Sequence, residues 1–217
     1  GFLGSFIVRH LAAAGHQVTA LIRPSTRRDH IAPFIDRYVE GDQADESAWP
    51  ALLKNADSLI HASIARHAWN EDQSDPLNLH LHSNLLSSIK LLRASSPRQF
   101  IFISSMAVHH DLNHHRLNLK DDHPLPGSYY AACKSAIEAH VHAEHLGGRA
   151  TAIIRPCRTY GIDPNLERSE GHSIIESLRR SEPFRQTGWG RWVHVEDVGA
   201  AAVAIVGNPA TSGRVYD

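Results

Sequence analysis

The sequence predicts an α/β fold, built as a doubly wound parallel sheet with helices on both faces. Short apolar runs alternate with longer amphipathic segments along the 217 residues, and the runs end in small or polar residues. Strands buried on both faces read as continuous apolar runs, and helices between them provide the crossovers that parallel pairing requires. Ligands of such sheets bind beyond the carboxyl ends of the strands.

The elements can be assigned in order along the chain. Strands are expected over residues 17–22, 38–39, 58–61, 100–103, 150–154 and 192–195, with a further strand near 215–217. Helices are expected over residues 4–14, 46–54, 77–93, 129–146, 171–180 and 196–206, and a polar loop over 111–126. Helical periodicity predicts the inner face of the helix over 77–93 to be Leu81, Leu85, Ile89 and Leu92.

Composition and charge exclude several classes of protein. Hydrophobic residues make up 42% and charged residues 21%, which is typical of a globular chain. The 22 basic and 23 acidic residues give a net charge of -1, which argues against a nucleic-acid binder. No run approaches the roughly 20 apolar residues of a membrane span. Two cysteines, Cys133 and Cys157, fit a reducing compartment, so we expect a cytoplasmic protein.

Two positions near the start of the chain predict a dinucleotide site. Gly1 and Gly4 open the first helix, where glycines let the backbone approach a pyrophosphate, although an ordinary turn is the alternative. Arg23 ends the following strand, 19 residues after Gly4 (23 − 4). An acidic residue there binds the ribose hydroxyls of NAD, whereas an arginine suits the 2′-phosphate of NADP. We therefore expect NADP to be preferred over NAD, with a solvated basic loop as the alternative.

Three residues predict acid–base chemistry. Tyr130 and Lys134 are four residues apart, which places them on one face of a helix. An ammonium beside a tyrosine favours the phenolate form, so the tyrosine can exchange a proton with a substrate oxygen near neutral pH. Ser105, at the end of a strand, can hydrogen-bond the same oxygen. A Tyr–Lys pair alone is also common as a surface feature, so the prediction depends on the combination.

The ordered set of motifs resembles the extended short-chain dehydrogenase/reductase family, also called the NAD-dependent epimerase/dehydratase family. The similar segments are Gly41-Asp42, Leu59-Ile60-His61-Ala62, Phe102-Ile103-Ser104-Ser105, Tyr130-x-x-x-Lys134, Arg155-Pro156 and Val193-His194-Val195-Glu196-Asp197. The resemblance covers nearly the whole chain and implies a Rossmann-like fold. It differs at His109-His110, where the family often has Tyr-Gly, and at Tyr129, which is a rival to Tyr130 without a lysine at i+4.

The resemblance implies roles for further residues. The resemblance implies that Lys134 also holds the nicotinamide ribose. It further implies cofactor binding by Asp42, Gln43, Ala62, Ser63, Arg155 and Pro156. It makes Asn84 a structural or proton-relay residue of the active-site helix. His109 and Arg191 are expected to touch the substrate. His61 and His194 are expected to be core or near-core residues with satisfied hydrogen bonds.

The resemblance also implies a division of the chain. Residues 1–161 are expected to form the NAD(P)-binding domain, 162–191 part of a small substrate lobe, and 192–217 a return to the first domain. Because the chain opens inside the phosphate loop, we expect a fragment of a longer enzyme that lacks the first strand, leaving a gap in the sheet. We expect this fragment to bind cofactor poorly and to fold marginally. A homodimer through residues 77–93 and 129–146 is also implied.

The predicted function is NAD(P)-dependent hydride transfer at a secondary alcohol or ketone carbon of a small molecule, a sugar nucleotide or another carbonyl compound. One alternative is a non-catalytic NADP-binding sensor or interaction module on the same fold. Another is a metal-dependent hydrolase that uses the histidines at 109–115, but that segment has the composition of a loop, so no metal site is expected.

Overall fold

The computed structural model describes residues 1–64, 77, 81–109, 124–166, 169, 172–182 and 191–217. Its strands are β1 (Thr19–Ile22), β2 (Arg37–Glu40), β3 (Ser58–His61), β4 (Gln99–Ile103), β5 (Thr151–Ile154), β6 (Arg158–Tyr160), β7 (Trp192–His194) and β8 (Arg214–Tyr216). Its helices are α1 (Phe2–Ala13), α2 (Trp49–Leu53), α4 (Ser87–Ala94), α5 (Tyr129–Leu146), α6 (His172–Arg179) and α7 (Val195–Ile205). A π-helical segment, η4 (Leu81–Leu86), leads into α4.

All strand pairs of the described residues are parallel, which confirms the predicted fold class. The main sheet has the order β3-β4-β5-β8, while β1-β2 and β6-β7 form separate two-stranded sheets. Within the described residues, β1 and β2 are thus not hydrogen-bonded to the main sheet. The carboxyl ends of β3, β4 and β5 meet at one edge, which is where a ligand of this fold binds.

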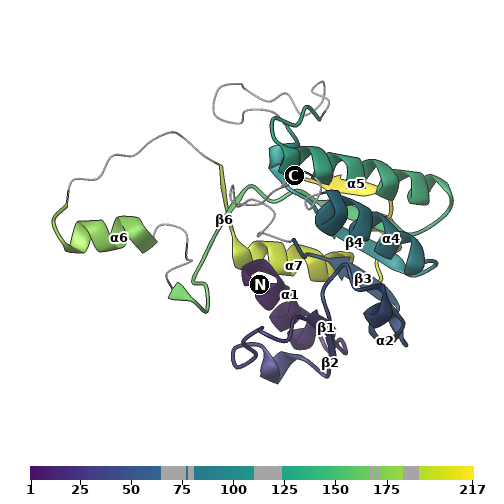
Figure 1. Ribbon diagram of the computed structural model, residues 1–217, viewed down its shortest axis with the longest axis horizontal. Coiled ribbons are helices and arrows are strands. Elements are labelled where there is room, and N and C mark those ends of the chain that lie inside the picture. The colour runs from purple at the N-terminus through teal and green to yellow at the C-terminus, as the bar shows by residue number, and fades with distance from the viewer. Residues whose placement is uncertain (65–76, 78–80, 110–123, 167–168, 170–171, 183–190) are drawn as a thin grey trace.

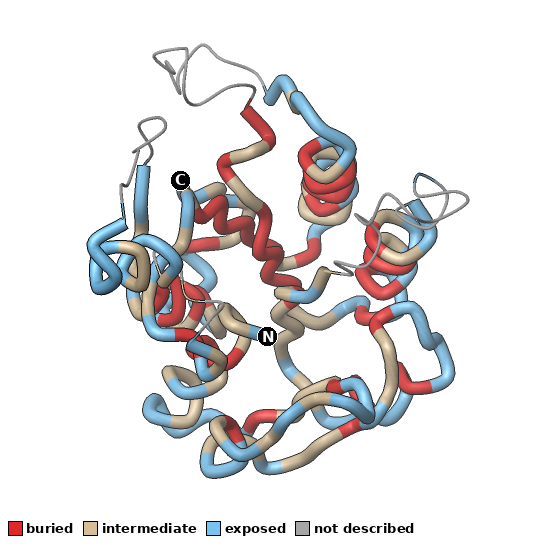
Figure 2. The backbone as a smooth tube through the Cα atoms, turned by 60° about the vertical axis from the view of Figure 1, so that its left-hand side comes forward, coloured by how far each residue is buried: buried red, intermediate tan, exposed pale blue. Residues whose placement is uncertain are grey.

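The main sheet is the middle of three layers (Figure 1). In β4, Phe100 and Phe102 pack with α4 and α5 on one face, and Ile101 and Ile103 pack with α1 and α7 on the other. Successive side chains of a strand point to opposite faces, so one apolar run can fill both cores. In Figure 2 the buried stretches of the tube accordingly run through the middle of the molecule.

The helix predicted over 77–93 differs from the structure in its buried face. The predicted face included Leu81, which is exposed, whereas Asn84, Ser87, Ser88, Leu91 and Leu92 are buried. Those five positions follow the i, i+3, i+4, i+7, i+8 spacing of one helix face. The polar residues of this face lie where the π-helical η4, which contains Asn84, joins α4. π-Helical geometry is frequent at functional sites.

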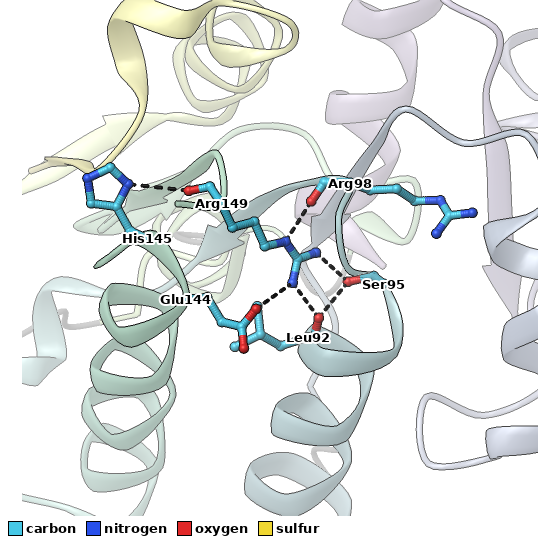
Figure 3. Close-up of polar contacts among 6 residues, drawn as sticks. All are labelled: Leu92, Ser95, Arg98, Glu144, His145 and Arg149. Atoms are coloured by element: carbon cyan, nitrogen blue, oxygen red, sulfur yellow. Dashed lines mark hydrogen bonds and ion pairs between the residues drawn. The ribbon is translucent and has the colours of Figure 1, made fainter. Parts of the chain in front are cut away.

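The buried side chain of Arg149 connects the carboxyl end of α4 to the residue that precedes β4 (Figure 3). The guanidinium of Arg149 donates to the carbonyls of Leu92 (2.5 Å) and Arg98 (2.6 Å) and to the hydroxyl of Ser95 (2.7 Å). Glu144 pairs with the same group at 3.3 Å. The Leu92 carbonyl also accepts from the Ser95 hydroxyl at 2.9 Å, so Arg149 adds a second donor at the end of α4 and joins it to Arg98.

Helix α6 stands apart from the main sheet in Figure 1 and buries none of its residues. It belongs to the segment 162–191 that the sequence assigns to a substrate lobe, and that assignment stays a prediction. The strand β6, which pairs with β7, was not predicted, because Arg158 and Tyr160 are exposed and lack an apolar pattern. Most of the predicted loop at 111–126 lies outside the described residues.

Candidate active site

The site begins at the amino end of α1. Gly1 caps this helix without a side chain, so the first backbone N–H groups face outward as anion donors. A Cβ atom placed on Gly4 would meet no heavy atom within 4 Å, so the space beside this glycine is open. A helix amino end with open space beside it is the arrangement that receives a phosphate group.

Ser105 directly follows the carboxyl end of β4, as predicted. Its backbone is extended, and its Oγ accepts a hydrogen bond from the amide of Ala107 at 3.1 Å. This bond caps the short 3-10 turn Met106–Val108 and holds the serine at the rim of the sheet. The hydroxyl hydrogen remains available to donate to another oxygen.

Tyr130 and Lys134 lie in the first two turns of α5, which begins behind a Ser128 cap. The Lys134 Nζ lies 6.0 Å from the centre of the Tyr130 ring and 4.6 Å from that of Phe102. The rival Tyr129 is 68% exposed and belongs to a different face of the helix. The structure therefore brings Tyr130, and not its neighbour, to the lysine.

Lys134 is buried, at 7% exposure, and its ammonium donates to the carbonyl of Ile103 at 2.7 Å. Ile103 is the last residue of β4, so this bond connects α5 to the strand end that carries Ser105. Burial lowers the pKa of Lys134 from 10.5 to about 8, while Glu138 and Cys133 oppose that change. At neutral pH the group still carries its positive charge, now in a setting with little water.

Three predicted residues lie in a polar network between loops. The Gln43 side-chain amide donates to the Ser83 carbonyl and, at 3.3 Å, to Asn84 Oδ1, while its oxygen accepts from the Ser63 hydroxyl. Gln43 thereby joins the loop after β2 to the loop after β3 and to η4. Asp42 instead accepts from the amide of Ala44, and Ala62 packs against the core beneath α1.

Arg155 and Pro156 follow β5 and are both buried. The Arg155 guanidinium is occupied by Glu138, and its Nη1 also donates to His109 Nε2 at 3.2 Å and lies 3.4 Å from Asp217. Since a guanidinium only donates, His109 accepts through Nε2. The Pro156 carbonyl accepts from Met106. These contacts fix the frame of the site, and the cofactor and substrate roles assigned to these residues stay predictions.

The two remaining predicted arginines are exposed. Arg23 directly follows β1, and its carbonyl accepts from Thr26 in a tight turn. Nearby, Arg28 pairs with Glu40 and lies over the ring of Tyr38. Arg191 immediately precedes β7 and is exposed. The structure therefore leaves both side chains accessible from solvent and places them on different sheets.

The expectation for His61 is confirmed for its position in the core but not for its hydrogen bonds. His61 ends β3 and is 4% exposed, yet neither ring nitrogen has a hydrogen-bond partner within the described residues. The rings of Phe100 and Phe102 surround it, at 6.1 and 5.6 Å between centres. Its apolar neighbours in the sequence indicated a core position but gave no sign of missing partners. His194, in contrast, accepts from the Glu196 amide at 3.4 Å, as expected.

The donors on this edge fit a nicotinamide dinucleotide. The amino end of α1 supplies amides for a diphosphate, Arg23 a cation beyond β1, and Tyr130 with Lys134 an acid–base pair beyond β4. Among the residues that the structure describes, no three His, Cys, Asp or Glu side chains gather as metal ligands, and the histidines at 110–115 lie outside them. No described helix is long and apolar enough to span a membrane.

A parallel sheet, a glycine-opened helix and a Tyr–Lys pair are typical of nicotinamide-dependent oxidoreductases. The chain belongs to the NAD dependent epimerase/dehydratase family, whose model matches residues 1–217. This finding confirms the resemblance drawn from the motifs. It also confirms the predicted class of enzyme, one whose members depend on NAD and act as epimerases, dehydratases and reductases.

Individual relatives are distant. The chain is 26% identical to the low-salt glycan biosynthesis protein Agl12 of Haloferax volcanii, covering 100% of this chain and 73% of that protein. It is 24% identical to a putative dihydroflavonol 4-reductase of Synechocystis, covering 92% and 59%. The chain thus spans 59% to 73% of the length of these two relatives.

Solved structures share the fold. The dTDP-glucose 4,6-dehydratase DesIV of Streptomyces venezuelae superposes with a TM-score of 0.80 at 22% identity, covering 100% of this chain and 72% of that one. The epimerase Mth375 of Methanothermobacter thermautotrophicus superposes with a TM-score of 0.81 at 21% identity, covering 99% and 68%. Because both identities are low, these similarities establish the fold and leave the substrate open.

Proposed function

We propose that the full-length protein is an NADP-preferring oxidoreductase that transfers hydride at a secondary alcohol or ketone carbon of a small molecule. The observation that carries this proposal is the position of Lys134, buried between the Tyr130 ring and the Ile103 carbonyl. A buried ammonium that bonds to the strand end before Ser105 and lies 6.0 Å from the centre of the Tyr130 ring has no evident use in a purely structural helix. It is suited to a proton transfer at that edge.

The residues divide the chemistry between them. When bound, the nicotinamide supplies or accepts the hydride. The Tyr130 hydroxyl donates a proton to the substrate oxygen during reduction and removes one during oxidation. The Lys134 charge stabilises the phenolate that this exchange leaves behind. The Ser105 hydroxyl donates to the same substrate oxygen and holds it in line with Tyr130.

The preference for NADP is supported by Arg23. Its side chain is exposed beyond β1, whereas Arg27 and Arg28 face the carboxylates of Asp29 and Glu40. A guanidinium is well matched to a phosphate monoester. Among the relatives, several are named as reductases and others as sugar-nucleotide enzymes, so we propose either a sugar nucleotide or another small carbonyl compound as substrate.

The decisive experiment combines binding with turnover. Full-length protein is titrated with NADPH and NADH by fluorescence and then assayed with a panel of ketones and sugar nucleotides. We expect Tyr130→Phe to keep cofactor binding and to lower turnover by about 10²–10⁴-fold. The control Tyr129→Phe should leave both unchanged. Binding of neither nucleotide would overturn the class, and tight binding without turnover on any substrate would favour a sensor.

A second experiment tests the nucleotide preference. Arg23→Ala should weaken NADPH binding by about tenfold or more, because it removes a charge-assisted contact, and leave NADH binding nearly unchanged. Arg93→Ala, which removes an exposed arginine on α4, is the matched control. Equal losses for NADPH and NADH would contradict the preference.

We further propose a cytoplasmic homodimer. Exposed apolar residues on the two helices assigned to the interface support this proposal: Leu81, Leu86, Tyr129 and Leu146. Two free cysteines, Cys133 and Cys157, suit a reducing compartment. Sedimentation of the full-length protein as a monomer at micromolar concentration would contradict the dimer, and an oxidised or secreted native form would contradict the compartment.

A further inference from the structure

The helical segment that leads into α4 has an unusual winding. Segment η4 (Leu81–Leu86) is π-helical, and the ordinary α-helix α4 continues from Ser87. π-Helical turns are rare, and they interrupt the regular i→i−4 hydrogen bonding of a helix. The persistence of this turn therefore points to contacts that hold it in place.

The carbonyls of this turn accept hydrogen bonds from side chains. The Ser83 carbonyl accepts from the Ser87 hydroxyl at 2.7 Å and from the side-chain amide of Gln43. The Asn84 carbonyl accepts from the Ser88 hydroxyl. Serine bonds to the carbonyl four residues earlier bend a helix and compete with its main-chain bonds. Gln43 differs from both serines because it comes from outside the helix, in the loop after β2.

Gln43 is held at both ends of its side-chain amide. The residue is buried, at 8% exposure. Because a carbonyl only accepts, the amide nitrogen must face Ser83, and it also donates to Asn84 Oδ1 at 3.3 Å. The amide oxygen accepts from the Ser63 hydroxyl, and the main-chain carbonyl of Gln43 accepts from the Trp49 indole at 3.2 Å. The side chain therefore cannot turn away from η4 without losing several hydrogen bonds.

We propose that Gln43 is a positioning residue: it keeps η4 π-helical and thereby fixes the side of this segment that faces Tyr130. Asn84 and Ser88 line the same small cavity as Tyr130, so the winding of η4 decides what lies against the tyrosine. Gln43 acts through η4, because both N–H groups of its amide are used inside the protein. The consequence for turnover rests on the proposed function, whereas the consequence for η4 does not.

The same bonds connect two parts of the site that are distant in the sequence. Gln43 lies in the loop after β2, Ser63 in the loop after β3, and Ser83 in the segment that faces α5. A displacement of the loop after β2 is therefore passed to η4, and from there to Tyr130, through one side chain. Misplacing a reacting group by about 1 Å can lower a rate by about 100-fold.

Full-length Gln43→Met protein tests the inference, because methionine keeps the length of the side chain but has no N–H to donate. A crystal structure shows the winding of η4, urea unfolding measures stability, and NADPH-dependent turnover measures function. We expect residues 81–86 of the variant to form α-helical hydrogen bonds. We also expect turnover at saturating NADPH and substrate to fall about tenfold or more.

The matched control is Gln99→Met. The Gln99 side chain donates to the Ile205 carbonyl at 3.0 Å and accepts from the Ser58 hydroxyl at 2.8 Å and the Gly207 amide at 2.9 Å. It lies at the amino end of β4, the end opposite the site. We expect this variant to lower the urea midpoint as Gln43→Met does, while η4 and turnover stay unchanged. The comparison separates positioning from a general loss of stability.

Should Gln43→Met fail to fold, Gln43→Asn repeats the test, because it keeps an amide but is one methylene too short to bridge Ser63 and Ser83. A π-helical η4 in the variant, unchanged turnover in a variant whose η4 has changed, or an equal loss of turnover in Gln99→Met would each overturn the inference. Absence of turnover in the wild-type protein would count against the proposed function only, since the winding of η4 is measured without it.

Discussion

The guanidinium of Arg155 and the carboxylate of Glu138 form a buried two-bond pair, with 3.0 Å from Nε to Oε1 and 2.8 Å from Nη2 to Oε2. Glu138 is four residues beyond Lys134, as Lys134 is beyond Tyr130, so the three lie on one face of α5. The pair therefore ties the rotation of this helix to the carboxyl end of β5. The orientation of Tyr130 depends on a contact remote from its own side chain.

Removing one partner of this buried ion pair should strongly destabilise the folded protein. We expect Glu138→Gln to lower the free energy of unfolding by about 3 kcal/mol, because it removes the buried carboxylate that bonds the guanidinium twice and leaves only the more distant Asp217 as a counter-charge. Glu176→Gln breaks an ion pair with Arg179, a side chain that is 73% exposed, and is the control. That change should cost about 0.5 kcal/mol or less. Urea unfolding measures both, and equal losses would contradict the role of the pair.

Arg149 permits a sharper test of hydrogen-bond geometry. Arg149→Lys keeps the charge but loses the planar group that reaches the Leu92 and Arg98 carbonyls together. We expect a loss of about 2–4 kcal/mol in urea unfolding, since the buried hydrogen bonds that Arg149 makes to Leu92, Ser95 and Arg98 cannot all be kept. Arg93→Lys, in the exposed last turn of α4, should change stability by less than about 0.5 kcal/mol. A tolerated Arg149→Lys would show that water satisfies these carbonyls instead.

Alanine substitutions at two glycines can distinguish the stability cost of backbone strain from that of a steric clash. Gly207 and Gly213 both have left-handed backbones, with φ of 68° and 74°. A Cβ on Gly207 would meet nothing within 4 Å, whereas one on Gly213 would lie 2.3 Å from His145 Nε2. We expect Gly207→Ala to cost about 1–2 kcal/mol and Gly213→Ala to cost more. Thermal unfolding ranks them, and the added His145→Ala change should remove the difference.

Acid should destabilise the protein through His61. The unfolded chain binds a proton at this residue near pH 6.5, but the folded chain does so only near pH 3. Between these values the unfolded state binds more protons, so the free energy of unfolding falls as pH falls, by about 1.4 kcal/mol per pH unit. His61→Gln should remove that contribution, and His140→Gln, at an exposed position, should not. Urea unfolding at pH 7, 5.5 and 4.5 measures the slopes, and identical slopes for His61→Gln and wild type would contradict the assignment.

The strands were predictable because burial on both faces leaves a simple signal. Residues 100–103 are apolar without interruption, and they fill the cores on both faces of the sheet. The inner face of α4 was not predictable in the same way. The buried residues where it joins η4 are Asn84, Ser87 and Ser88, of which Asn84 and Ser88 line a small cavity, so their polarity does not mark a solvent-exposed face. Apolar periodicity misleads at the edge of a site, where buried residues are polar.

The candidate site was likewise predictable only in part from the sequence. The pairing of Tyr130 with Lys134 was predictable from their spacing, and the structure brings the two together, while their catalytic role with Ser105 stays a proposal. The hydrogen bonding of His61 was not predictable, because a histidine in an apolar strand carries no sign of whether its nitrogens are bonded. That property depends on α5 and η4, which are distant in the sequence. Likewise, the contact between Arg155 and Glu138 arises only when β5 and α5 are packed.

The parallel pairing of the strands has a kinetic consequence. No strand of the described residues pairs with its chain neighbour through a hairpin, and register partners such as Ser58 with Gln99 and Ala152 with Arg214 are far apart in the chain. To form these pairs, long loops must close, and this costs conformational entropy before the contacts between the strands can stabilise the chain. We therefore expect folding to be slow for the size of the chain, and β8 can pair with β5 only after the intervening segment has been synthesised.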